Sequence, residues 1–264
     1  MERGRGGIFL YDEAGIPGGL GMAVLLSSSG TAFPVLSGTF DDGGPSAIMA
    51  LQGLRASRTV RAWHPSACVG ASDHVSALIS ALRWKQALAV EYDAMYLPPG
   101  GYGQSSQRGT EYPPAGRMAA GGIAEYRRAA LADLDALYPL AASYEKSEVM
   151  TAMHAFDPAA CRATQAKNLK TQLVYLATMR GRVVARAQTN ARGWAFDQIG
   201  GIFVEPEFRG LGLGRGVVDA LVSDLAARNR GVSLFVKKSN AVARSLYLSM
   251  GFSRSRDYRV SYFA

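Results

Sequence analysis

The sequence predicts an α/β protein with mixed sheets, built in two parts. Short apolar runs with strand alternation are interspersed with segments of helical period. Residues 98–121 are rich in Gly, Pro and Ser and follow neither period, which is typical of a linker. The 264 residues suffice for two cores, and 48% hydrophobic and 19% charged residues are typical of a globular protein.

The first part, residues 1–97, has the pattern of a small α/β domain in the order β-β-β-α-β-α-β. We expect strands at 7–11, 21–26, 32–36, 58–63 and 87–97, and helices at 46–54 and 73–82.

The second part, residues 122–264, opens with an expected strand at 123–129 and two helices. The first helix covers 131–149 and carries Pro139 as a kink. The second begins at Asp157, an N-cap followed by Pro158 in the first turn, and ends near Lys170.

An antiparallel meander then leads to two further helices. The expected strands of the meander cover 172–178, 182–189 and 194–204, and a further strand follows at 232–236. The last expected elements are a helix at 241–250, closed by Gly251, and a strand pair within 255–263. After the third strand comes an amphipathic helix with Val217, Leu221 and Leu225 on one face, and Gly231 is its expected C-terminal cap.

The stretch "EPEFRGLGLGRGVVDAL", residues 205–221, joins a strand to that helix. It lacks the third glycine of a dinucleotide-binding GxGxxG motif and the GK[ST] of a Walker A loop. Turned backbone N–H groups, the helix N-terminus and the charges of Arg209 and Arg215 favour an anion such as pyrophosphate. A plain glycine-rich turn is the alternative.

Two motifs resemble the GNAT superfamily of acyl-CoA-dependent N-acyltransferases. Arg-x-x-Gly-x-Gly at 209–214 resembles the family's pyrophosphate signature. "NAVARSLYLSMGF", residues 240–252, resembles its pattern N-x-x-A-x-x-L-Y-x-x-x-G-F. The resemblance covers residues 122–264 and implies a GNAT fold there.

The resemblance implies direct transfer of an acetyl or other acyl group from acetyl-CoA to an amine, without a metal. The residues that it implies for binding coenzyme A are Phe203, Val204, Arg209, Gly210, Leu211, Gly212, Leu213, Gly214, Arg215 and Asn240. Tyr247 would protonate the departing thiolate. A helix N-cap role for Asn240 and a packing role for Tyr247 are the open alternatives.

An attacking ammonium must first lose a proton, which requires a carboxylate or a water chain. Asp197 and Glu145 are the main candidates for this general base, and Glu148 and Glu205 are further ones. A solvated surface charge is the alternative for each.

The first part resembles a degenerate GNAT-like domain that has lost its cofactor site. Its order repeats that of the second part from the meander onward, and residues 91–97 match 257–263 in acidic, aromatic and apolar positions. In that alignment Ala81 replaces Tyr247 and His74 replaces Asn240. An unrelated α/β domain is the alternative.

Charge and composition limit the classes of binding partner and cofactor that we expect. The net charge of +8 resides in the second part, because acidic and basic residues balance through residue 121. The two cysteines and three histidines form no metal-ligand spacing, and neither an 18-residue apolar run nor a signal peptide is present, so we expect a cytoplasmic protein without a metal. The expected partner is a small-molecule or peptide amine, and no membrane is expected. A second copy of the chain, in a homodimer, is a further candidate partner.

Two other functions remain open at this stage. One is a regulatory protein that binds acyl-CoA without turnover. The other is nucleic-acid binding by the basic second part, which would show affinity that falls steeply with salt. We expect no nucleic-acid partner.

Overall fold

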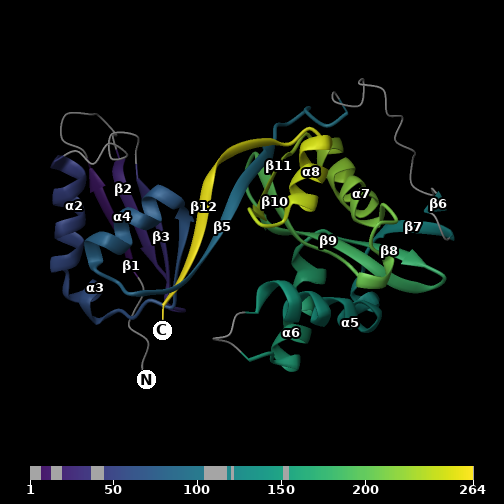
Figure 1. Cartoon of the computed structure of the whole chain (residues 1–264), viewed down its shortest axis with the longest axis horizontal. Coiled ribbons are helices and arrows are strands. Elements are labelled where there is room, and N and C mark those ends of the chain that lie inside the picture. Colours follow the sequence, from purple (N-terminus) through teal and green to yellow (C-terminus); the bar gives the residue numbers. More distant parts are fainter. Residues whose placement is uncertain are drawn as a thin grey trace. The chain divides into compact units, whose positions relative to one another are not determined.

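The computed structural model describes residues 7–12, 20–36, 45–103, 118–119, 122–150 and 155–263, so most of the expected linker at 98–121 lies outside the description. The chain forms two compact units (Figure 1). Unit 1 comprises Met1–Ala94, Phe235–Asn240 and Ser255–Ala264, and unit 2 comprises Met95–Leu234 and Ala241–Arg254. Each unit is therefore assembled from segments that are not continuous in the sequence.

The sheet of unit 1 has the order β1-β2-β3-β4-β12-β5. Its strands are β1 (Gly7–Asp12), β2 (Leu20–Leu26), β3 (Thr31–Leu36), β4 (Ala67–Ala71), β5 (Gln86–Leu97) and β12 (Ser253–Phe263). Strands β3 and β4 are parallel, whereas β12 runs antiparallel to β4. The strand pair expected within 255–263 is wrong, because β12 is one uninterrupted strand that completes this sheet.

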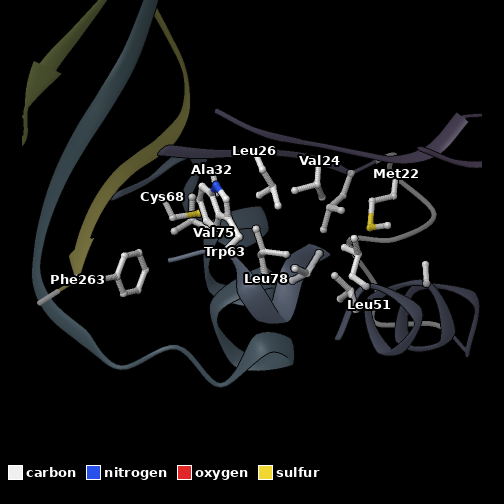
Figure 2. Close-up of a cluster of buried hydrophobic side chains, with 14 residues drawn as sticks. Met22, Val24, Leu26, Ala32, Leu51, Trp63, Cys68, Val75, Leu78 and Phe263 are labelled. Atoms are coloured by element: carbon white, nitrogen blue, oxygen red, sulfur yellow. The ribbon is translucent and has the colours of Figure 1, made fainter. Parts of the chain in front are cut away.

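One face of the unit 1 sheet packs on helices. These are α2 (Pro45–Ala56), α3 (Arg58–Ala62) and α4 (Ser72–Leu82). Met22, Val24 and Leu26 alternate along β2 and are buried, since successive strand residues point to opposite faces. They point toward Leu51 and Leu78 of the helices (Figure 2).

The opposite face of that sheet carries large apolar side chains that are exposed among the described residues. They are Ile8, Leu10, Leu25, Phe33 and Val35. Register pairs Ile8 with Leu25 and Leu25 with Phe33, so the exposed side chains form a continuous row. This face of β1, β2 and β3 is thus exposed among the residues that the structure describes.

The strand expected at 58–63 is wrong. This segment forms α3 because Val60 and Trp63, three residues apart, are both buried, which is a helical spacing. The Trp63 indole N–H also donates to the Ser27 carbonyl at 3.1 Å. The expected strand position is taken instead by β4, where Cys68 is buried.

The sheet of unit 2 has the order β11-β10-β9-β8-β7-β6. Its strands are β6 (Met118–Ala119), β7 (Gly122–Arg128), β8 (Val174–Met179), β9 (Arg182–Arg192), β10 (Phe196–Val204) and β11 (Gly231–Lys237). Pairing is antiparallel from β7 to β10 and parallel between β10 and β11. The division between the units falls within β5, β11 and β12.

Helices cover both faces of the unit 2 sheet, with α7 and α8 on one face and α5 and α6 on the other (Figure 1). The helices are α5 (Leu134–Tyr144), α6 (Pro158–Thr171), α7 (Leu213–Ala227) and α8 (Ala241–Ser249). Short helical turns are η2 (Leu131–Asp133), η3 (Glu145–Val149, of π type) and η4 (Pro206–Phe208). The buried face of α7 includes Val217, Leu221 and Leu225, as the periodicity predicts.

Two helix ends differ in how well the sequence predicts them. The Asp157 cap is confirmed, since its carboxylate accepts the N–H groups of Ala159 and Ala160 at 2.9 and 3.1 Å. Gly231 is not a cap. It opens β11, where a side chain would overlap the Phe196 ring, and Asn229 takes the left-handed conformation after α7 with φ of 53°.

The expected helix at 131–149 is divided into η2, α5 and η3, with Pro139 inside α5. The order β1-β2-β3-α2-α3-β4-α4-β5 matches β8-β9-β10-α7-β11-α8-β12 apart from α3. When α4 and α8 are aligned at their first residues, the buried Leu78 rather than Ala81 takes the place of Tyr247. Unit 1 therefore has no phenol at that position.

Candidate active site

The edge of β10 that faces β11 is paired over only a short length. The parallel register joins Phe196, Asp197 and Gln198 to Gly231–Ser233. Beyond Gln198 the strand continues to Val204 without β11 as a partner. Such an edge presents backbone N–H and C=O groups to which an extended ligand can add as a further strand. The expected ligand-pairing residues Phe203 and Val204 lie on this segment.

A β-bulge interrupts β10 within that segment. Gly200 pairs with Gln188 and Phe203 with Arg186, so β10 has one more residue than β9 between these pairs. Gly201 has φ of 58°, and a Cβ there would lie 3.1 Å from Nη2 of Arg186. Both the backbone and the close approach of Arg186 therefore require glycine.

The glycine-rich loop after β10 turns into the first turn of α7. Gly210 and Gly212 have φ of 79° and 80°, and open space surrounds both Cα atoms. The first helical bond runs from the Gly216 N–H to the Gly212 carbonyl at 3.0 Å. The N–H groups of residues 213–215 precede it and have no acceptor within the helix. This arrangement of donors fits an anionic phosphate group.

Two arginines flank the loop. Arg209 donates from Nε to the Val204 carbonyl at 3.2 Å, and its guanidinium lies 5.5 Å from the centre of the Phe203 ring. Arg215 donates to the Ser249 hydroxyl at 2.6 Å, which joins α7 to α8. Leu211 is half-buried and Leu213 is buried. The expected cationic residues are thus held at the β10 end of the loop and in the first turn of α7.

Tyr247 of α8 is buried, with a ring 5.8 Å from that of Phe252. Burial raises its pKa, and the nearby Tyr144 phenol raises it further. Tyr144 in turn packs edge-on against Phe203, with 5.9 Å between ring centres. The expected acid Tyr247 is therefore protonated at neutral pH. It lies near the aromatic pair formed by Tyr144 and by Phe203 of β10.

Asn240 belongs to unit 1 and immediately precedes α8. Its side chain is exposed, and its backbone N–H donates to the Lys237 carbonyl at 2.8 Å. Its role as a ligand of coenzyme A stays a prediction.

Two of the four candidate bases have arginine partners. Asp197 is 1% exposed and forms an ion pair of 3.2 Å with Arg230. It lies six strand residues from Phe203, or roughly 20 Å at the rise of a β-strand. Glu205 forms an exposed pair of 3.2 Å with Arg182. The structure thus does not bring Asp197 together with Phe203 and the loop.

Glu145 and Glu148 lie half-buried on η3, directly after Tyr144. Both raise the pKa of the Tyr144 phenol, in addition to the larger effect of burial, whereas Arg186 lowers it. The Cys161 thiol donates to Glu145, and burial raises the pKa of that thiol to about 12. These two carboxylates therefore act on the Tyr144 phenol, which packs on Phe203.

Arg186 is a buried residue of this region that the sequence analysis did not identify. It is 1% exposed and donates from Nη1 to the Gln165 amide oxygen at 2.8 Å. Its Nη2 donates to the Gln188 amide oxygen, and the guanidinium lies 5.8 Å from the Tyr144 ring centre. Burial lowers the pKa of Arg186 to about 10, so it is charged at neutral pH. The available signal was the polar alternation of Arg186 and Gln188 within an apolar strand.

Within the described ranges, no group of three or more His, Cys, Asp or Glu side chains could hold a metal ion. No helix in the same ranges has both the length and the apolar character needed to cross a membrane.

A family model described as FR47-like protein matches residues 181–261, which include the β10 edge, the loop and Tyr247. A search of curated proteins found no match.

Several solved structures have a similar fold over almost the whole chain. An acetyltransferase of the GNAT family from Colwellia psychrerythraea has a TM-score of 0.60 at 11% identity, covering 93% of this chain and 82% of its own. A GCN5-related N-acetyltransferase from Kribbella flavida has a TM-score of 0.57 at 14% identity, with coverage of 98% and 90%. A tandem GNAT protein from the clavulanic acid biosynthesis pathway has a TM-score of 0.55 at 13% identity, with coverage of 93% and 80%.

At these identities the likeness shows a shared fold, which agrees with the repeated element order of the two units. The chain thus shares the fold of these GNAT proteins and contains an FR47-like segment.

Proposed function

We propose that unit 2 is an N-acyltransferase that moves an acetyl or other acyl group from acyl-CoA to an amine. The observation that carries this proposal is the unpaired β10 edge leading directly into the glycine-rich loop and the α7 N-terminus. An extended arm ending in a pyrophosphate has the shape and charge that these two adjoining features accept.

The loop fits coenzyme A in both space and charge. Gly210 and Gly212 leave open space above the backbone, and the N–H groups of residues 213–215 suit the pyrophosphate oxygens. Arg209 adds a full positive charge at the β10 end of the loop. Phe203 and Val204 lie on the part of β10 that has no β11 partner and can pair with the arm. The bulge at Gly201 alters the direction of backbone N–H groups, one of which would stabilise the oxyanion that forms during attack.

The reaction needs one base and one acid. A carboxylate of Glu145 or Glu148 accepts a proton from the acceptor ammonium, and the free amine attacks the thioester carbonyl carbon. A C–N bond forms, the C–S bond breaks, and the thiolate takes a proton from Tyr247. The resulting phenolate takes back the remaining extra proton from the nitrogen of the new amide. The raised pKa of Tyr247 keeps that proton available at neutral pH.

A thiol-release assay tests the proposal. Purified protein is mixed with acetyl-CoA or longer acyl-CoAs and a panel of amines, and free thiol is measured over time. We expect acceptor-dependent release that Tyr247→Phe reduces roughly 10²- to 10⁴-fold, the usual contribution of a general acid. Tyr96→Phe, which changes an exposed tyrosine of β5, is the matched control and should keep full activity.

The other outcomes are equally informative. Binding of CoA without release for any amine would favour the regulatory alternative. Absence of both binding and release would refute the assignment of this site.

A further inference from the structure

Arg186 is a buried cation without a carboxylate partner among the described residues. The residue is 1% exposed, yet no Asp or Glu of the described ranges forms an ion pair with it. Both hydrogen-bond acceptors that it has, Gln165 and Gln188, are neutral amides. Its Nε is buried and has no acceptor. A buried guanidinium is normally balanced by an anion, and no described residue supplies one here.

The surrounding amides hold the guanidinium in one orientation. The Gln188 amide nitrogen donates to the Asn190 side-chain oxygen at 3.1 Å, which fixes which end of Gln188 faces Arg186. The Gln165 oxygen accepts from Nη1 at 2.8 Å. The donor Nε remains available for a further acceptor, and a carboxylate can bridge two donors of one guanidinium.

Arg186 also lies at the proposed reaction site. It is the cross-strand partner of Phe203, and directly paired residues of two strands point to the same face of a sheet. Its Nη2 lies beneath Gly201 of the bulge, where no side chain intervenes. Its guanidinium carbon lies over the Tyr144 ring, 5.8 Å from the ring centre, and the half-buried Tyr144 packs on Phe203.

We propose that Arg186 binds the carboxylate of the acyl acceptor, so that the acceptor is a small amino acid or another short amine that carries a carboxylate. The inference rests on the proposed acyltransferase function of the same site. The carboxylate reaches the guanidinium past the ring of Tyr144 and supplies the missing negative charge.

The charges around Tyr144 suit both ends of such a molecule. Glu145 and Glu148, which act on Tyr144 from η3, attract the ammonium group, while Arg186 on β9 attracts the carboxylate. A polyamine would place a second positive charge toward Arg186, which is unfavourable. The site thereby selects zwitterionic acceptors over cationic ones.

The test compares acids with their own amides. Glycine, alanine and β-alanine are each assayed beside the matching amide, with spermidine as a cationic acceptor, by thiol release from acetyl-CoA. We expect kcat/KM for the best acid to exceed that of its amide by roughly 10- to 100-fold, as a charge-assisted hydrogen bond can provide. Spermidine should be a poor acceptor.

Variants then test whether Arg186 is the residue that causes the preference for acids over their amides. Arg186→Gln should raise KM for the acid and leave the amide unchanged, and Arg186→Lys should keep part of the preference. Arg192→Gln changes an exposed arginine of the same strand and should leave the preference intact. The comparison of acids with amides needs no variant, so the test survives if Arg186→Gln fails to fold.

A thermal-shift titration separates failure of this inference from failure of the proposed function. Stabilisation of the wild-type protein is measured first with acetyl-CoA alone. It is then measured with each acid and each amide, in the presence and in the absence of acetyl-CoA. Stabilisation by the acids and not by their amides supports carboxylate binding even if no acyl transfer is found. The inference is overturned if acyl transfer or stabilisation does not distinguish the acids from their amides. It is also overturned if neither the acids nor the amides stabilise the protein, whether or not acetyl-CoA binds.

Discussion

Arg186 illustrates a residue whose burial favours function at the expense of stability. Transfer of an unpaired charged group out of water costs several kcal/mol, and the two neutral amides offset only part of this cost. Arg186 is nevertheless among the most completely buried large side chains. A binding role accounts for its presence, because strain and unbalanced charge are tolerated mainly at functional sites.

Replacement of Arg186 by methionine should therefore leave stability unchanged or raise it. The apolar side chain fills a similar volume and removes the desolvation cost of the charge, which offsets the loss of the hydrogen bonds to Gln165 and Gln188. The midpoint of thermal unfolding measures the effect, with Arg192→Met as an exposed control. A fall of several degrees in the Arg186→Met protein alone would instead indicate a structural role.

At the residue scale, the sequence predicts motif residues far better than residues brought together by folding. Gly210, Gly212 and Tyr247 follow a linear spacing that can be read directly. Arg186 and Tyr144 come from β9 and the end of α5, and only the packing of α5 on the sheet brings them together. Asp197 shows the converse, since its position in the sequence does not reveal its ion pair with Arg230.

Among the elements, β10 and the loop after it determine the site. The bulge at Gly201, the short pairing with β11 and the left-handed glycines all lie within one continuous segment. A regular strand that is paired along both edges leaves no backbone groups for a ligand, and each of these features departs from that regular pairing or geometry. The tandem glycines inside the strand pattern were the sequence signal for the bulge.

Gly212→Ala should destabilise the loop and weaken CoA binding, because φ of 80° costs a non-glycine residue roughly 1–2 kcal/mol. The matched control is Gly53→Ala, at an exposed position of α2 where an added Cβ meets no atom within 4 Å. That change should stabilise by roughly 0.5–1 kcal/mol, since alanine favours a helix. Denaturant unfolding with and without CoA measures both effects, and equal stability changes of the same sign would contradict this account of the loop.

Element types were predictable where local signals and burial agree. The Asp157 cap and the alternation of β2 are read from neighbouring residues alone. The segment 58–63 was mistaken for a strand because Val60 and Trp63 suit either structure, and the choice depends on burial against the unit 1 core. The cap after α7 was missed because Asn229 adopts a conformation that glycine usually provides.

On the scale of the whole molecule, the chain returns to unit 1 at its end. Strand β12 lies between β4 and β5, and Phe263 joins the core of unit 1 with its ring 5.4 Å from that of Trp84. The repeated element order was predictable from pattern, whereas this pairing was not, because strand order depends on contacts between residues that are distant in the sequence.

Deletion of residues 255–264 should therefore unfold unit 1 while unit 2 stays folded. The deletion removes β12 from the middle of the sheet and Phe263 from the core. Hydrogen exchange should become fast in β2, β3 and α4 and remain slow in β8 and β9. Retained protection in β2 and α4 would show that unit 1 does not depend on its last strand.

Titration of coenzyme A by isothermal calorimetry tests the central claim most directly. The account predicts one-to-one binding in the micromolar range, typical of enzyme substrates, and its loss when Arg209→Glu places a negative charge beside the loop. The exposed Arg192→Glu change should leave binding intact. Absence of binding to the wild-type protein, or equal binding to the Arg209→Glu protein, would contradict it.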